Sequence, residues 1–294
     1  MKRTIASLVF LLIAQCLLLG ILQFLESGES VKSEALLAAD KLKHLDQIEI
    51  EDQMGMSLRL QKRRGRWLLP ALQDLPANQK RVEQLIDTLS NHRHGFPVAD
   101  SSAARQRFWV ASYQYHQRLS FVGQDELLGT VYLGRSPAFR KVYARNDISD
   151  SIYRLSYNHH DVPATAEAWL DLQLLRYSDV TAVSIDGWSI RRGAHDLWTE
   201  RDNRTVEPAL LSTILSALGE LSISAIATEA TQRSLAESGQ PKRIMQVAQD
   251  GKLSTLKLFQ QGRKFYIHDS RYRPYFRIGA LQYQRLMQLA ADKA

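Results

Sequence analysis

Two stretches of the sequence decide the fold prediction: RKVYARNDISDSIYRL at residues 140–155 and RKFYIHDSRYRPYFRI at residues 263–278. They align without a gap, and Arg, Lys, Tyr and Arg are identical at the first, second, fourth and fifteenth positions. Apolar residues alternate with polar ones in both stretches, which predicts β-strands with one face toward a core. The match predicts that one structural unit occurs twice in the chain.

The surrounding sequence repeats in the same order. A hairpin-like segment ends at Trp67 in the first copy and at Trp198 in the second. Each is followed by a stretch with apolar residues at helical spacing, within residues 82–89 and 211–218. Strand-like segments at 127–134 and 252–259 come next, and a closing helix ends each copy. The sequence therefore predicts an α+β fold, with two tandem repeats of a hairpin-helix-β-meander-helix unit.

The N-terminal segment reads IASLVFLLIAQCLLLGILQFL at residues 5–25 and carries no charge. As a helix it is about 31 Å long, which matches the hydrocarbon thickness of a bilayer, so it predicts a transmembrane helix. A cleaved signal peptide is the alternative, but the apolar run is longer than such peptides need, and no small-residue cleavage pattern follows. Lys2 and Arg3 precede the run, which predicts a cytoplasmic N-terminus.

These observations predict the domain organisation and the location. We expect a cytoplasmic tail at 1–4, the membrane span at 5–25, a stalk helix or linker at 26–44, and periplasmic repeats at 45–175 and 176–294. The expected location is the bacterial inner membrane, crossed once, with most of the chain in the periplasm. Gln15 and Gln23 are candidate contacts with partner helices. Cys16 is the only cysteine and is a weak lipidation candidate, because Gln15 precedes it.

Several features of the repeats resemble a known family. They are Ile48 and Ile50 before the hairpin, residues 65–67 (Gly-Arg-Trp), the helix at 82–89, residues 98–100 (Val-Ala-Asp) and the strands at 140–155. The chain resembles domain-of-unknown-function family 4340 from residue 45 to its end. That family consists of extracytoplasmic proteins often encoded beside ABC-2 type and gliding-associated transporters. The resemblance implies an accessory role in the envelope and supplies no catalytic residues.

Catalytic motifs are missing from the sequence. It has no phosphate-binding loop, no dinucleotide fingerprint, no G-x-S-x-G elbow and no H-E-x-x-H pair. His92 with His94, and His159 with His160, are weak metal candidates, because Arg93 separates the first pair and adjacent histidines in extended chain point apart. We therefore expect a protein that is not an enzyme and holds no cofactor or metal. A hydrolase acting on the envelope is the most distant alternative.

The repeated strands also suggest a binding surface. Since alternate residues of a strand share one face, polar residues of both copies are predicted to form an exposed basic and aromatic face. The candidate residues are Lys141, Tyr143, Arg145, Arg154, Lys264, Tyr266, His268 and Arg277. The net charge of +7 agrees with an anionic partner, although a solvated sheet face explains the same pattern.

Together these expectations favour a non-enzymatic accessory subunit of an envelope ABC-type transport assembly. Its expected partners are the permease and ATPase subunits, contacted through the anchor and the exported repeats, and no nucleic acid is expected. The alternative is a periplasmic module that binds an anionic lipid or envelope polymer.

Overall fold

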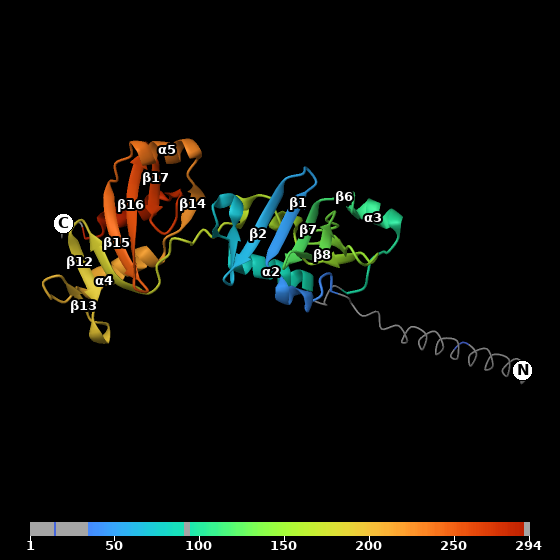
Figure 1. Cartoon of the computed structure of the whole chain (residues 1–294), viewed down its shortest axis with the longest axis horizontal. Helices are drawn as coiled ribbons and strands as arrows, with labels where there is room; N and C mark the ends of the chain where they lie inside the picture. The colour runs from blue at the N-terminus through green and yellow to red at the C-terminus, as the bar shows by residue number, and fades with distance from the viewer. Residues whose placement is uncertain (1–14, 16–34, 91–94, 291–294) are drawn as a thin grey trace, which may run out of the picture.

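The computed structural model describes residue 15 and residues 35–90 and 95–290 of the 294 residues. Within these ranges the chain forms two large antiparallel sheets, a two-stranded sheet and five α-helices (Figure 1). The first large sheet is built from residues 47–155 and the second from residues 180–278.

The first sheet has the strand order β10-β9-β8-β7-β1-β2-β3-β4. Its strands are β1 (Gln47–Asp52), β2 (Ser57–Arg63), β3 (Arg66–Leu69), β4 (Leu75–Pro76), β7 (Gln117–Gly123), β8 (Glu126–Leu133), β9 (Val142–Asn146) and β10 (Tyr153–Leu155). Helices α2 (Gln79–Ser90) and α3 (Ser102–Phe108) and the small sheet of β5 (Val110–Ala111) and β6 (Gln114–Tyr115) lie between β4 and β7 in the chain.

The second sheet has the order β13-β12-β11-β15-β16-β17-β18-β14. Its strands are β11 (Val180–Ile185), β12 (Trp188–Arg192), β13 (Trp198–Glu200), β14 (Ile223–Ile226), β15 (Arg243–Gln249), β16 (Lys252–Gln261), β17 (Lys264–Asp269) and β18 (Tyr275–Ile278). Its helices are α4 (Pro208–Gly219), α5 (Glu229–Glu237) and α6 (Ala280–Gln288).

The two sheets share one arrangement. In each, a hairpin and a third strand are followed by a helix, and the chain then returns to pair the next long strand with the first: β7 with β1, and β15 with β11. The registers also agree, because Arg154 lies opposite Tyr143 in the first sheet and Arg277 lies opposite Tyr266 in the second.

The inner face of each sheet is covered by the amphipathic helix that follows the third strand. Val82, Leu85 and Leu89 of α2 are fully buried, and so are Ile214 and Leu218 of α4. Trp67 and Trp198 belong to the same hydrophobic core, which joins both sheets, so these two side chains pack inside the protein.

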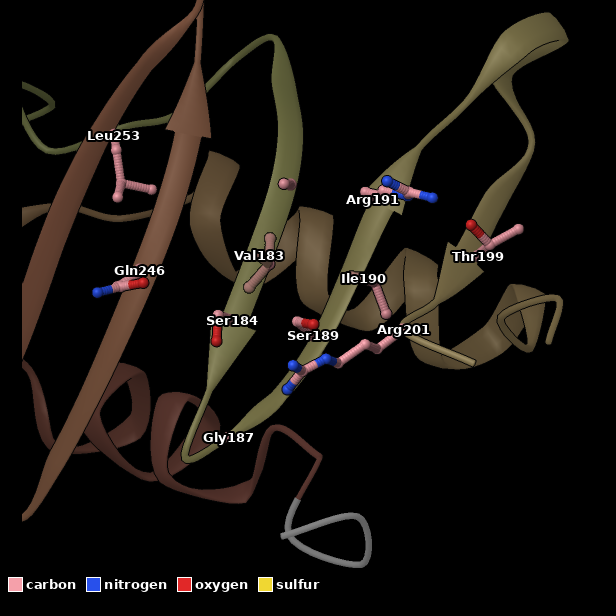
Figure 2. A pocket seen from close by; sticks show the side chains of 11 residues that line it. Val183, Ser184, Gly187, Ser189, Ile190, Arg191, Thr199, Arg201, Gln246 and Leu253 are labelled. Atoms are coloured by element: carbon pink, nitrogen blue, oxygen red, sulfur yellow. The ribbon is translucent and has the colours of Figure 1, made fainter. Parts of the chain in front are cut away.

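A shorter helix covers part of the opposite face in each sheet. Tyr143 packs with Phe108 at the end of α3, and Tyr266 clusters with Leu235 of α5 and Phe259 of β16. Both helices begin at a hydroxyl N-cap, Ser101 for α3 and Thr228 for α5. The rest of that face in the second sheet stays open and forms a groove over β11, β12 and β15 (Figure 2).

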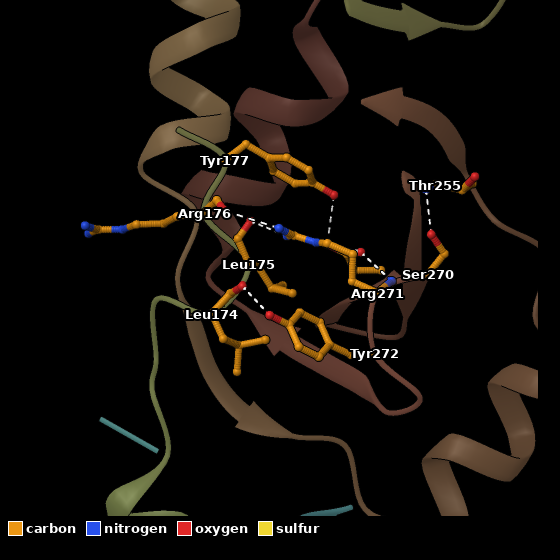
Figure 3. Close-up of polar contacts among 9 residues, drawn as sticks. Leu174, Leu175, Arg176, Tyr177, Thr255, Ser270, Arg271 and Tyr272 are labelled. Atoms are coloured by element: carbon orange, nitrogen blue, oxygen red, sulfur yellow. Dashed lines mark hydrogen bonds and ion pairs between the residues drawn. The ribbon is translucent and has the colours of Figure 1, made fainter. Parts of the chain in front are cut away.

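Residues 163–177, which we call the strap, connect the two sheets. Trp169 is fully buried and donates its ring N–H to the carbonyl of Pro163, and Ala77 pairs with Leu170 in an isolated bridge. At the other end, Arg271 lies between the rings of Tyr177 and Tyr272, 3.9 and 5.6 Å from their centroids (Figure 3). The strap is therefore fixed to the first sheet at one end and to the second at the other.

The predicted α+β class is wrong. The described residues are mainly antiparallel β-sheet, with helices of only 7 to 12 residues. Two predicted helical regions account for part of the difference. The first copy closes with a 3₁₀ turn, Ala166–Trp169, and residues 35–44 contain only the 3₁₀ turn Lys41–His44. Leu36 and Leu37 enter the core, since apolar residues near a sheet gain more from burial than from a solvated helix.

The predicted membrane anchor also needs correction, and with it the single-pass inner-membrane location and the periplasmic assignment. No helix in the described ranges is long and apolar enough to cross a bilayer. The segment 5–25 that motivated the prediction lies outside the described residues except for Gln15, as do the tail at 1–4, Cys16, Gln23 and the start of the predicted stalk. The assignments of location that depended on this helix are withdrawn.

Candidate functional site

The predicted basic residues of the first copy share one face of β9 and β10 but differ in exposure. Arg154 is exposed, and Lys141 and Tyr143 are half-buried. Arg145 is buried: its side chain donates to the carbonyls of Val110 and Ser149, and it stacks on the ring of Tyr132 at 5.0 Å. Burial lowers the pKa of Arg145, and the nearby guanidinium of Arg105 adds to this. Arg145 therefore links Val110 of β5 to the loop after β9 and is not exposed to a ligand.

In the second copy Lys264 and Arg277 are exposed, His268 is half-buried and Tyr266 is buried. Helix α5 explains the burial of Tyr266, because it lies on this face of the sheet. His268 packs against Tyr275 with 4.7 Å between ring centroids. Burial, and then the ammonium group of Lys257, lower the pKa of His268. The eight predicted residues therefore do not form one continuous exposed face.

A different basic surface lies at the end of the first sheet, where the C-terminus of α3 meets the loop between β8 and β9. We call it the basic end, and it consists of Arg107, Arg135, Arg140 and Lys141. Arg107 stacks on Phe108 at 5.5 Å, Arg135 on Trp109 at 4.9 Å and Arg140 on Phe139 at 5.6 Å. Of the four residues, only Lys141 was among the predicted site residues.

Backbone geometry fixes the basic end. The amide of Arg135 donates to the carbonyl of Phe108, and the amide of Tyr143 donates to the carbonyl of Arg135. A Cβ at Gly134 would lie 2.1 Å from the carbonyl oxygen of Phe108, so only glycine allows the loop and the helix end to approach this closely. Trp109 caps α3 with a left-handed φ of 59°. Arg107 and Arg135 therefore extend from a closely packed base, whereas Arg140 lies in the exposed part of the loop.

The electrostatics of the basic end favour anions. Among the described residues, none of its three guanidinium groups has an acidic partner within ion-pair distance. An arginine stacked on an aromatic ring keeps its planar fork of N–H donors free, and this fork matches carboxylates and phosphates. Nearby, burial and then the charge of Arg135 lower the pKa of His116, as expected beside a cationic group.

Among the described residues, this surface occurs in the first copy and not in the second. The β8–β9 connection runs from Gly134 to Lys141, whereas β16 and β17 are joined by the tight turn at Gly262 and Arg263. Arg107 and Arg135 were not among the predicted site residues because they lie outside the aligned strands. The sequence did contain one indication of this surface: the connection before Val142 is longer than the equivalent connection in the second copy.

Other predicted candidates are placed as follows. His160 is exposed in a short 3₁₀ turn, while His92 and His94 and the side chain of His159 lie outside the described part. Within the described residues, no three His, Cys, Asp or Glu side chains are grouped so that they could hold a metal ion.

The described residues form a two-unit antiparallel β-protein with a basic, aromatic surface at one end of the first sheet. The family model described as domain of unknown function (DUF4340) matches residues 67–242, more than half of the chain. The chain belongs to this family, as the resemblance in its sequence predicted. Comparisons with curated proteins and with solved structures gave no significant match. The matched region begins in β3 and ends just before β15, so it spans the strap and parts of both sheets.

Proposed function

We propose that this protein is a non-enzymatic accessory subunit of an ABC-type transport assembly, with the permease and ATPase subunits as partners. The observation that supports this best is the basic end. Three arginines are held on aromatic rings without acidic partners, which is the arrangement expected of a surface that contacts another molecule. The choice of a transporter rests on the family resemblance, whose members are often encoded beside such systems.

The overall architecture is consistent with a subunit. Two similar units are joined by a strap, which pairs with Ala77 of the first unit and accepts a hydrogen bond from Arg271 of the second, and of the two units the first carries the long β8–β9 loop. A duplicated unit whose copies differ at the surface can contact two partners, or two parts of one partner, at the same time.

The test is affinity purification of the tagged full-length protein from its own cells in mild detergent, followed by mass spectrometry. We expect an ABC-type permease and its ATPase to be enriched. The triple variant Arg107→Glu, Arg135→Glu and Arg140→Glu should lose them, because like charges oppose the contact. The matched control replaces Arg263, Lys264 and Arg277, which are exposed on the second sheet, with Glu. This control should retain the permease and the ATPase.

If the triple variant retained both subunits, the basic end would not be the surface that contacts them. Their absence from the wild-type sample, and from in-cell crosslinking, would contradict the accessory role itself.

The second candidate is a binding module for an anionic lipid or polymer, which the same unpaired arginines favour. Sedimentation with vesicles of phosphatidylglycerol should then recover the purified protein, and vesicles of phosphatidylcholine should not. The triple variant should stay in the supernatant with both vesicle types.

A further inference from the structure

The open groove on the second sheet has a volume of about 590 Å³ and lies over β11, β12 and β15 (Figure 2). Its floor carries small polar side chains, Ser184 and Ser189, with Gln246 on the neighbouring strand. The serines are cross-strand partners, and Ser184 also lies opposite Gln246. No part of this groove overlaps the basic end, which belongs to the first sheet.

The first sheet shows why the groove exists. There Glu49 lies opposite Arg59 and Ser120, between the buried residues Ile48 and Ile50. In the second sheet Ser184 lies between Val183 and Ile185 in the same register, so Ser184 takes the place of Glu49 and Ser189 that of Arg59. The side chains of Glu49 and Arg59 form an ion pair of 2.9 Å across this face of the first sheet. Two serines in its place leave the second sheet open.

The charged residues that line the groove are all basic. Arg191 and Arg201 line it, and none of its lining residues is acidic. Both residues are exposed, and in the described part of the chain neither guanidinium makes a hydrogen bond or an ion pair. Figure 2 shows the side chain of Arg201 extending from the end of β13 toward the turn at Gly187. The groove therefore offers two unpaired cations beside hydroxyl and amide groups.

We propose that this groove binds an acidic peptide segment of a partner protein in an extended conformation. Arginine forks bind carboxylates, while the serine hydroxyls and the amide of Gln246 can donate to and accept from a peptide backbone. The exposed side chain of Leu253 adds an apolar contact at one side. The groove is only partly enclosed, which suits an extended chain better than a small molecule, since small-molecule sites enclose most of their ligand.

Fluorescence anisotropy with purified full-length protein tests this inference and needs no transporter, so it can fail independently of the proposed function. The probe is a fluorescein-labelled octapeptide in which Glu alternates with Leu, and the reference peptide has Gln in place of Glu. We expect binding of the first only, weakened by added salt. Arg191→Ala and Arg201→Ala should each weaken it by about fivefold.

The decisive variant transfers the ion pair of the first sheet into the groove: Ser184→Glu with Ser189→Arg. The first sheet carries this pair at the same register, so the variant should fold, which circular dichroism and thermal melting check. It should lose the peptide. The matched control, Glu49→Ser with Arg59→Ser, changes the other sheet and should bind as the wild type does.

Three results would overturn the proposal: equal binding of the Glu and Gln peptides, unchanged binding by the folded Ser184→Glu, Ser189→Arg variant, or tighter binding of a glucuronate disaccharide that displaces the peptide. The last result would assign the groove to an acidic saccharide.

Discussion

At the scale of single residues, the fully buried carboxylate of Asp269 is the polar centre of the second sheet. It accepts hydrogen bonds from the hydroxyl of Tyr177 at 2.9 Å and from the guanidinium of Arg271 at 2.7 Å. Arg271 also donates to the carbonyl of Leu175 (Figure 3). Burial, and then the charge of Asp269, raise the pKa of Tyr177, which keeps it a neutral donor. This group holds the end of the strap on β17.

Replacing Asp269 with Ala should destabilise the protein by about 3–5 kcal/mol, because it leaves Arg271 and Tyr177 without their buried acceptor. Urea unfolding followed by circular dichroism measures the change. The control is Glu220→Ala, which removes the exposed ion pair with Arg285 and should cost less than about 1 kcal/mol. Equal losses in the two variants would mean that the buried carboxylate has no special role.

His268 makes the stability depend on pH. Its pKa is lowered from the ordinary 6.5, so the native state binds this proton less tightly than the unfolded chain does. The stabilising contribution is therefore complete above 6.5 and is lost as the pH falls through the lowered pKa of the folded state. His268→Phe retains ring packing against Tyr275 but cannot gain a proton. The free energy of unfolding should fall less steeply in this variant than in the wild type between about pH 7 and pH 5, and identical slopes would contradict the assignment.

At the scale of elements, the helices and strands that have a clear local pattern of apolar residues could be predicted from the sequence. The helices within 82–89 and 211–218 occur as α2 and α4, and the stretches aligned at the outset occupy β9–β10 and β17–β18. The patterns could not show that α3 and α5 lie on the second face of each sheet, because those helices lie in connections that the two copies share only weakly. Tyr266 and Arg145 were expected at the surface for this reason, and packing across sequence-distant elements buries them.

The loop at the basic end gives a prediction of its own. Gly134→Ala should destabilise the protein by about 1–3 kcal/mol, since its Cβ would lie 2.1 Å from the carbonyl oxygen of Phe108 and 2.7 Å from that of Trp109. Thermal melting measures the effect. Gly279→Ala is the matched control, because a Cβ there meets nothing within 4 Å. A melting temperature equal to that of the control would show that the loop moves aside without cost.

At the scale of the whole molecule, one hydrophobic core cluster includes residues of both sheets and of the strap, among them Trp67, Trp169 and Trp198. Arg81 of α2 adds a polar contact, since it stacks on Trp169 at 4.7 Å and donates to the carbonyls of Ala168 and Asp161. The two sheets share the order of seven strands, but the eighth lies at opposite edges, with β4 beside β3 and β14 beside β18. They also differ where the basic end and the groove lie. A sequence comparison between the copies finds the strands that they share. The surfaces that differ are found only when the strand-pairing register shows which residues of the two sheets occupy equivalent positions.

The continuous core predicts that the two sheets unfold together. Differential scanning calorimetry should give one transition whose calorimetric and van't Hoff enthalpies agree. Trp169→Ala should lower that transition and separate it into two, because it removes the largest fully buried side chain of the strap. Two transitions in the wild type would contradict a shared core.

The accessory role is tested most directly by photocrosslinking in cells from position 139. Phe139 is 87% exposed at the basic end, so p-benzoylphenylalanine can replace it without disturbing the fold. The same residue at Leu281, which is exposed on the second unit, serves as the control position. We expect a crosslink from position 139 to an ABC-type permease or ATPase subunit, and we expect the double variant Arg135→Glu, Arg140→Glu to lose it. The absence of any protein crosslink from position 139, while the full-length protein is present and folded, would contradict it.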